Sequence, residues 1–155
     1  MTLPLRHIVT LGYEGAGIDD FLATLAALGV TTLLDVRELP MSRRKGFAKT
    51  ALREGLARVG IGYRHERALG SPKAIRHQLR DDGDYARFFA AFRRHLDAQG
   101  ALLDRLAHEL AGTVALLCVE RDPATCHRSV VADALGARMG LVPRHHDVAT
   151  RDAPR

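Results

Sequence analysis

The chain has no tryptophan and two cysteines, and aromatic residues make up 5% of its 155 residues. Two cysteines cannot form the set of disulfides that stabilises small secreted proteins, and they lack the C-x-x-C spacing of common zinc motifs. The scarcity of aromatic residues leaves few side chains on which nucleic-acid bases could stack. These deficits disfavour a disulfide-rich scaffold and a protein that recognises single-stranded nucleic acid.

Long hydrophobic runs are also missing. The opening stretch MTLPLRHIVTLGYEG holds an apolar run that is too short for a membrane span, and Glu14 soon follows it. We therefore expect no signal peptide, no membrane association and a cytoplasmic location. The sequence contains no internal repeat, and its mass of 17.0 kDa suits one domain. We predict a single domain over residues 1–148 and a frayed tail over 149–155. The sequence indicates no particular oligomeric state.

Short apolar segments alternate with segments of helical periodicity. Strands are predicted over 7–13, 30–36, 61–66, 113–120 and 141–148, and helices over 18–29, 47–60, 85–96, 101–111 and 129–140. Residues 68–84 are predicted to form a loop with a short helix. Because strands that alternate with helices pair in parallel and are covered on both faces, the pattern predicts a single three-layer α/β domain, Rossmann-like, with a mainly parallel sheet of about five strands. Pro143 weakens the last strand and predicts that it lies at an edge of the sheet.

Positive charge is concentrated in one part of the chain. Residues 37–80 contain 12 lysines and arginines against three acidic residues, whereas the whole chain has a net charge of +5. Such a segment creates a local positive field that attracts phosphates or nucleic acid, although a solvated basic face has the same composition. The charge therefore predicts a phosphate-bearing small molecule or a nucleic acid as the partner.

Polar segments follow four of the predicted strands, at ends that a parallel sheet brings to one edge. Ligands bind at this edge in open α/β sheets. Glycines flank the first segment, the second is rich in arginine, and the fourth contains both cysteines. The candidate substrate-binding residues at this edge are Tyr13, Glu14, Asp35, Arg37, Ser42, Arg43, His127 and Arg128.

The predicted reactive group is Cys126, which lies at the start of the helix predicted over 129–140. Unpaired backbone N–H groups and the helix dipole favour negative charge there, so we expect a lowered pKa of Cys126 and a thiolate nucleophile or redox group. Glu120 and His65 are the candidate general acid or base. Cys118, inside an apolar strand, is expected to be a buried core residue.

An anion clamp is expected beside this thiol. Arg37, Arg43 and Arg128 carry guanidinium groups that bind phosphate or carboxylate in a bidentate manner. The sequence lacks the arginine that closes the loop of a cysteine phosphatase, so that particular mechanism is disfavoured.

Four stretches carry a family resemblance: TLGYEG, DVRELPMSRRKGFAK, GIGYRHERALG and LLCVERDPATCHRSVVA. In order and spacing they resemble the domain-of-unknown-function 488 family of bacteria and archaea, over residues 8–132. The resemblance implies a single α/β domain and no particular activity. It also implies a shared site made of the matching residues Tyr13, Glu14, Asp35, Arg37, Ser42, Arg43, His65, Cys118, Glu120, Cys126, His127 and Arg128.

Three functions are open on this evidence. The first is an enzyme with no predicted cofactor that acts on a nucleotide or nucleic acid through Cys126, and this is the hypothesis that we prefer. The second is a nucleic-acid-binding module without catalysis, which needs charge and shape alone. The third is a zinc site made by Cys118, Cys126 and His127, with a histidine such as His65 or His145 as a fourth ligand, because zinc binds sulfur and imidazole.

Overall fold

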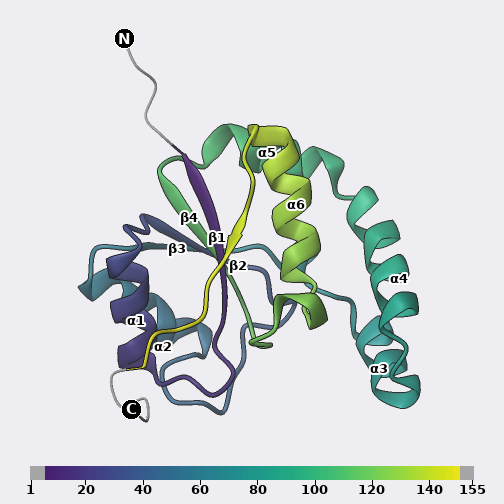
Figure 1. Cartoon of the computed structure of the whole chain (residues 1–155), viewed down its shortest axis with the longest axis horizontal. Coiled ribbons are helices and arrows are strands. Elements are labelled where there is room, and N and C mark those ends of the chain that lie inside the picture. Colours follow the sequence, from purple (N-terminus) through teal and green to yellow (C-terminus); the bar gives the residue numbers. More distant parts are fainter. Residues whose placement is uncertain (1–5, 151–155) are drawn as a thin grey trace.

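The sheet of the protein is parallel throughout. A computed structural model describes residues 6–150 and confirms the predicted α/β fold, with six α-helices in that part of the chain (Figure 1). Each pair of neighbouring strands is parallel. The strands lie in the order β3-β2-β4-β1-β5. Their bounds are β1 His7–Gly12, β2 Thr32–Asp35, β3 Gly62–His65, β4 Thr113–Cys118 and β5 Arg144–His145.

Helices cover both faces of this sheet, as expected for a three-layer domain. α1 and α2 pack on one face, and α5 and α6 pack on the other. The helix bounds are α1 Ile18–Ala27, α2 Lys49–Arg58, α3 Lys73–Asp82, α4 Tyr85–Asp97, α5 Gly100–Glu109 and α6 Arg128–Met139, with short 3₁₀ turns η1 Arg67–Leu69 and η2 Pro123–Thr125.

The two hydrophobic cores follow from the alternation of side chains along each strand. In β4, Val114, Leu116 and Cys118 point to the face covered by α4, α5 and α6, whereas Ala115 and Leu117 point to the face covered by α1 and α2. Because both faces are covered, the central strands are apolar at nearly every position rather than at every second one. The same alternation decides on which face of the sheet each polar side chain at a strand end lies.

Two segments differ in extent from their predictions. β5 is confirmed at the edge of the sheet, beside β1, but only two of the residues predicted over 141–148 are in the strand. The segment predicted as loop with a short helix contains the ten-residue helix α3. Of the tail predicted over 149–155, residues 151–155 lie outside the described part, and the Ala149 N–H donates to Thr24 Oγ1 at 3.0 Å.

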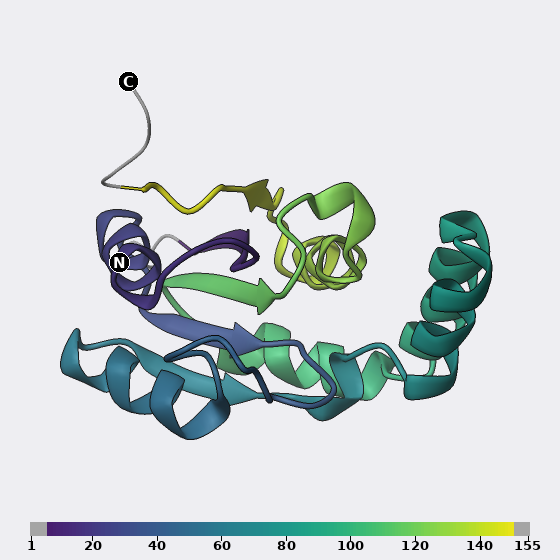
Figure 2. The ribbon, with the colours of Figure 1, turned by 90° about the horizontal axis from the view of Figure 1, so that it is seen from below.

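α3 and α4 form a helical hairpin that extends from one end of the domain (Figures 1 and 2). Gly83, with a φ of 64°, ends α3 in the left-handed conformation that favours glycine. Asp84 then caps α4, because its side chain accepts a hydrogen bond from the Arg87 N–H at 3.0 Å. α4 buries Phe88, Phe92 and Leu96, whereas α3 has no fully buried residue. The hairpin is therefore attached to the domain mainly through α4.

Across residues 6–150, no helix combines the length and the apolarity that crossing a membrane requires.

Candidate functional site

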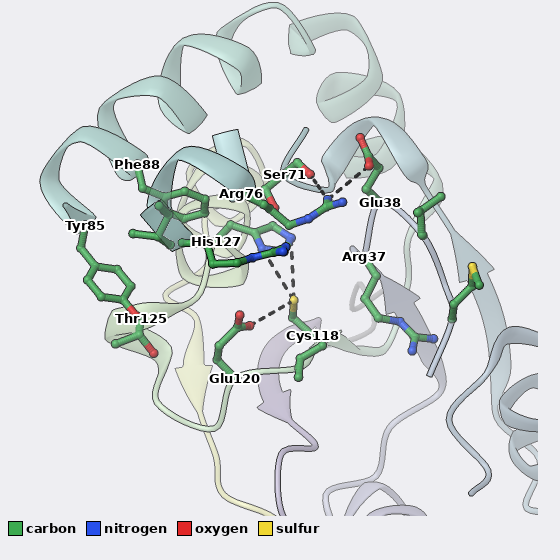
Figure 3. A pocket seen from close by; sticks show the side chains of 15 residues that line it. Arg37, Glu38, Ser71, Arg76, Tyr85, Phe88, Cys118, Glu120, Thr125 and His127 are labelled. Carbon is green, nitrogen blue, oxygen red and sulfur yellow. Dashed lines mark hydrogen bonds and ion pairs between the residues drawn. The ribbon is translucent and has the colours of Figure 1, made fainter. Parts of the chain in front are cut away.

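A pocket of about 650 Å³ lies at the carboxyl ends of β2 and β4, which are neighbours in the sheet. The segments that follow these two strands form one wall, and the α3–α4 hairpin forms another (Figure 3). A pocket of this size at this edge is where open α/β sheets bind small molecules. Its lining consists of Arg37, Glu38, Leu39, Met41, Ser71, Arg76, Leu79, Arg80, Tyr85, Phe88, Cys118, Val119, Glu120, Thr125 and His127.

Three chemically active side chains meet in this pocket. The Cys118 thiol, at the end of β4, lies 3.6 Å from Glu120 Oε2 and 3.6 Å from His127 Nδ1 (Figure 3). Cys118 is buried, as the sequence predicts, yet it lines the pocket. A buried thiol between an imidazole and a carboxylate has groups beside it that can take up or supply a proton.

The orientation of His127 is set by the neighbouring strand. Its Nε2 lies 2.7 Å from the carbonyl oxygen of Val36, directly after β2, and the Phe92 ring packs edge-on at 5.1 Å. A ring nitrogen that bonds a carbonyl must carry the proton, so Nδ1 is the unprotonated nitrogen of the neutral ring. Cys118 Sγ lies beside the ring, 3.6 Å from Nδ1 and 3.9 Å from Nε2. Burial by itself lowers the pKa of His127, but its interactions with Cys126 and with the Val36 carbonyl outweigh this and raise it.

The prediction of a lowered pKa for Cys126 is wrong. Cys126 immediately precedes the His127 N-cap of α6, but its side chain is 1% exposed and belongs to the core under α4–α6. Burial, followed by the interaction with Cys118, raises its pKa well above that of a free thiol, although His127 acts in the opposite direction. The helix terminus cannot offset the loss of solvent around a fully covered sulfur.

Arg37 and Asp35 form a buried ion pair on the opposite side of the strand. Arg37 Nε and Nη2 donate to the Asp35 carboxylate at 2.9 and 2.7 Å, and Nη1 donates to the Tyr13 hydroxyl and the Phe47 carbonyl at 3.2 and 2.8 Å. The Tyr63 hydroxyl donates to Asp35 at 2.6 Å. Tyr13, Phe47 and Tyr63 belong to the core under α1 and α2, so the guanidinium points away from Cys118 although Arg37 borders the pocket (Figure 3).

Arg128 and Glu14 brace the segment between β4 and α6. The fully buried Arg128 donates from Nη1 to the Glu120 carbonyl and from Nη2 to the Arg121 carbonyl, and Glu14 accepts a hydrogen bond from the Arg121 N–H at 3.3 Å. These contacts fix the backbone that carries Glu120. Arg37 and Arg128 thus both donate to protein groups, although Arg128 Nε has no hydrogen-bond partner within the described residues. The expected anion clamp stays a prediction.

The remaining candidates lie outside the pocket lining. His65 Nε2 bonds the Arg37 carbonyl at 2.8 Å, so it holds the end of β2 rather than facing the pocket. Ser42 accepts from the Arg44 N–H at 3.0 Å within a turn, and Arg43 is exposed beside it. Arg44 and Lys45 border a separate cavity between α1 and α2, so the basic segment is divided between two regions of the surface.

The residues that sequence reasoning missed come mostly from the α3–α4 hairpin: Leu79, Tyr85 and Phe88 provide apolar surface, and Arg76 and Arg80 provide charge. Arg76 Nη1 lies 3.2 Å from Glu38 and also donates to the Ser71 carbonyl. The apolar spacing of Ile75 and Leu79 on a basic segment was the available signal for an amphipathic α3 that covers a site.

Gly70 allows two pocket segments to approach each other. A Cβ at this position would lie 2.1 Å from the Glu38 backbone nitrogen and 2.3 Å from its Cα. We expect Gly70→Ala to destabilise the protein by about 3 kcal/mol in urea unfolding, the upper end of the range for overpacking, because backbone cannot rotate away. Gly17→Ala is the control, since its Cβ would meet nothing within 4 Å. Equal stability of the two variants would contradict this packing.

A family model described as "Domain of unknown function DUF488" matches residues 17–135. Searches of curated proteins and of solved structures find no match. The matched range includes the pocket segments after β2 and β4 and the whole α3–α4 hairpin. Because the match covers more than half of the 155 residues, the resemblance seen in the sequence motifs is confirmed, and the chain belongs to the family of the domain of unknown function DUF488.

Proposed function

We propose that the protein is an enzyme that binds a small organic anion, such as a nucleotide, in the pocket at the carboxyl ends of β2 and β4. The observation that carries this proposal is the position of Cys118, Glu120 and His127 together in a pocket that also has an apolar wall and a guanidinium group. Groups able to transfer protons in a largely apolar pocket with a few polar groups are the usual arrangement of an active site.

Arg80 supports the binding of an anion. Among residues 6–150 its guanidinium has no ion-pair partner, and its side chain belongs to the exposed, pocket-lining face of α3. The neighbouring Arg76 is paired with Glu38 and therefore contributes less net charge. A guanidinium binds phosphate or carboxylate with two parallel hydrogen bonds, and Arg80 can supply them.

The apolar wall supports a substrate with an apolar or aromatic part. The large apolar residues that line the pocket include Tyr85 and Phe88 from α4, Leu79 from α3, and Leu39 and Met41 after β2, while Ser71 and Thr125 supply neutral hydrogen-bonding groups. Met41 and Tyr85 are exposed, so their apolar surface is accessible to a ligand. A nucleotide combines the two required features, an aromatic base and an anionic phosphate.

Calorimetric titration with nucleoside monophosphates and with the matching nucleosides tests this function. We expect the monophosphate to bind more tightly than the nucleoside. Arg80→Ala should weaken monophosphate binding by about tenfold. This is the lower end of the range for hydrogen bonds to charged groups, because Arg80 is exposed.

Arg94→Ala is the matched control, because Arg94 is an exposed arginine on α4 that does not line the pocket. Equal effects of the two substitutions would indicate a general charge effect on binding and contradict an anion site at Arg80. Failure of nucleotides, organic phosphates and carboxylates alike to bind would contradict the proposed substrate class.

A further inference from the structure

We infer that Cys118, Cys126 and His127 bind a zinc ion at the base of the pocket. The Sγ atoms of the two cysteines and a ring nitrogen of His127 all lie within 4.8 Å of one another, and all three residues are buried. The two cysteines come from opposite ends of the β4–α6 connection, and the fold brings them together. Thiolate and imidazole are the ligands that zinc prefers in proteins.

The spacing of the ligand atoms suits this ion. Zinc bonds of about 2.3 Å to sulfur and about 2.0 Å to nitrogen, at a tetrahedral angle, place the two ligand atoms roughly 3.5 Å apart. Cys118 Sγ and His127 Nδ1 are 3.6 Å apart. Two thiolates also balance the charge of a divalent ion, which makes a buried site with this composition electrically neutral.

The hydrogen bond of His127 is an independent observation that favours a metal. A metal-binding histidine usually donates its second ring N–H to a carbonyl or carboxylate, which fixes the ring and its tautomer. The 2.7 Å contact between His127 Nε2 and the Val36 carbonyl leaves Nδ1 as the ring nitrogen that is free to bind a metal, 3.6 Å from Cys118 Sγ. The strand end that holds His127 is itself fixed by the buried Asp35–Arg37 pair.

The fourth position of the ion would face the pocket. Cys118 and His127 line the pocket, whereas Cys126 is covered, so a tetrahedral ion held by these three ligands is open on the pocket side. Three protein ligands with an open position are typical of catalytic zinc, and Glu120 lies next to Cys118 where it can accept a proton from a bound water. This catalytic role rests on the proposed function, whereas zinc binding itself does not.

Elemental analysis of the purified full chain tests the site. We expect about one zinc per chain, the stoichiometry of a single mononuclear site. The Cys126→Ser and His127→Ala variants should each lose most of this zinc. His95→Ala is the matched control, because the partly buried His95, like His127, bonds a carbonyl through Nε2 at 2.7 Å, here that of Ala68, and packs on Phe92. A different metal, or zinc content in His127→Ala equal to that in the control, would overturn the assignment.

Thiol labelling of the wild-type chain keeps the test independent of how the variants fold. We expect both cysteines to resist alkylation as purified and Cys118 to react faster than Cys126 after chelation, because only Cys118 lines the pocket. Re-addition of zinc alone should restore protection. Labelling that chelation does not change would overturn the site. Calorimetric titration of the chelated wild-type protein and of Arg80→Ala with nucleoside monophosphates tests the proposed function separately.

Discussion

Replacement of Asp35 with asparagine is expected to destabilise the protein by about 3–5 kcal/mol. Asp35 accepts three hydrogen bonds from Arg37, counting the backbone N–H at 3.2 Å, and one from Tyr63, and its side chain is completely buried. The asparagine amide cannot balance the charge of a guanidinium that is only 4% exposed. An uncompensated buried charge is among the largest costs that a single substitution can impose.

Urea unfolding followed by circular dichroism measures this effect. Asp104→Asn is the matched control, because Asp104 forms an ion pair of similar length with Arg138, at 2.8 Å, but its side chain is 73% exposed. The loss there should be at most about 1 kcal/mol. A loss below this value for Asp35→Asn would show that the buried pair does not stabilise the fold.

The ion pair also connects the stability of the fold to the pocket. Val36 lies between Asp35 and Arg37, and its carbonyl holds His127 on the other face of the strand. The Arg37 carbonyl accepts from His65 in the same way. The Asp35–Arg37 pair on one face of the sheet therefore holds the strand end that positions His127 on the other face. Asp35→Asn should also reduce the zinc content of the protein if the variant remains folded.

Glu120→Gln is expected to reduce turnover by about 10²–10⁴-fold, the usual contribution of a general acid or base. The substitution keeps the size of the side chain and removes its ability to accept a proton. The substrate for this measurement is whichever nucleotide or organic phosphate the wild-type protein converts fastest. Anion affinity and zinc content should not change, because Glu120 is assigned neither to the anion site nor to the three metal ligands.

Glu54→Gln is the control for Glu120→Gln, since Glu54 is an exposed glutamate on α2 and lies outside the pocket. A variant at Glu120 with wild-type turnover would exclude this residue as the acid or base. Loss of turnover together with loss of zinc would instead identify Glu120 as a fourth ligand.

The architecture of the protein follows from local patterns in its sequence. The apolar runs in β1, β2 and β4 predict strands buried on both faces, and the helical periodicity between them requires a parallel sheet with two helical layers. The position of Cys126 directly before α6 and the burial of Cys118 also follow from local pattern. These features depend on residues close in the chain, where periodicity and helix signals are strong.

The partner of each polar side chain depends instead on how the strands and helices pack together. Strand order places β4 beside β2, and alternation along the strands then directs Cys118 toward His127 on one face and Arg37 toward Asp35 and Tyr13 on the other. Nothing local distinguishes a guanidinium that binds a ligand from one that neutralises a buried carboxylate. The pocket also needs α3 and α4, and α4 joins the core through Phe92 and Leu96, which pack with residues far from α4 in the chain. The sequence therefore predicts which chemical groups lie near the edge of the sheet. The surroundings of each group depend on how the layers pack, and these surroundings set its pKa and its accessibility.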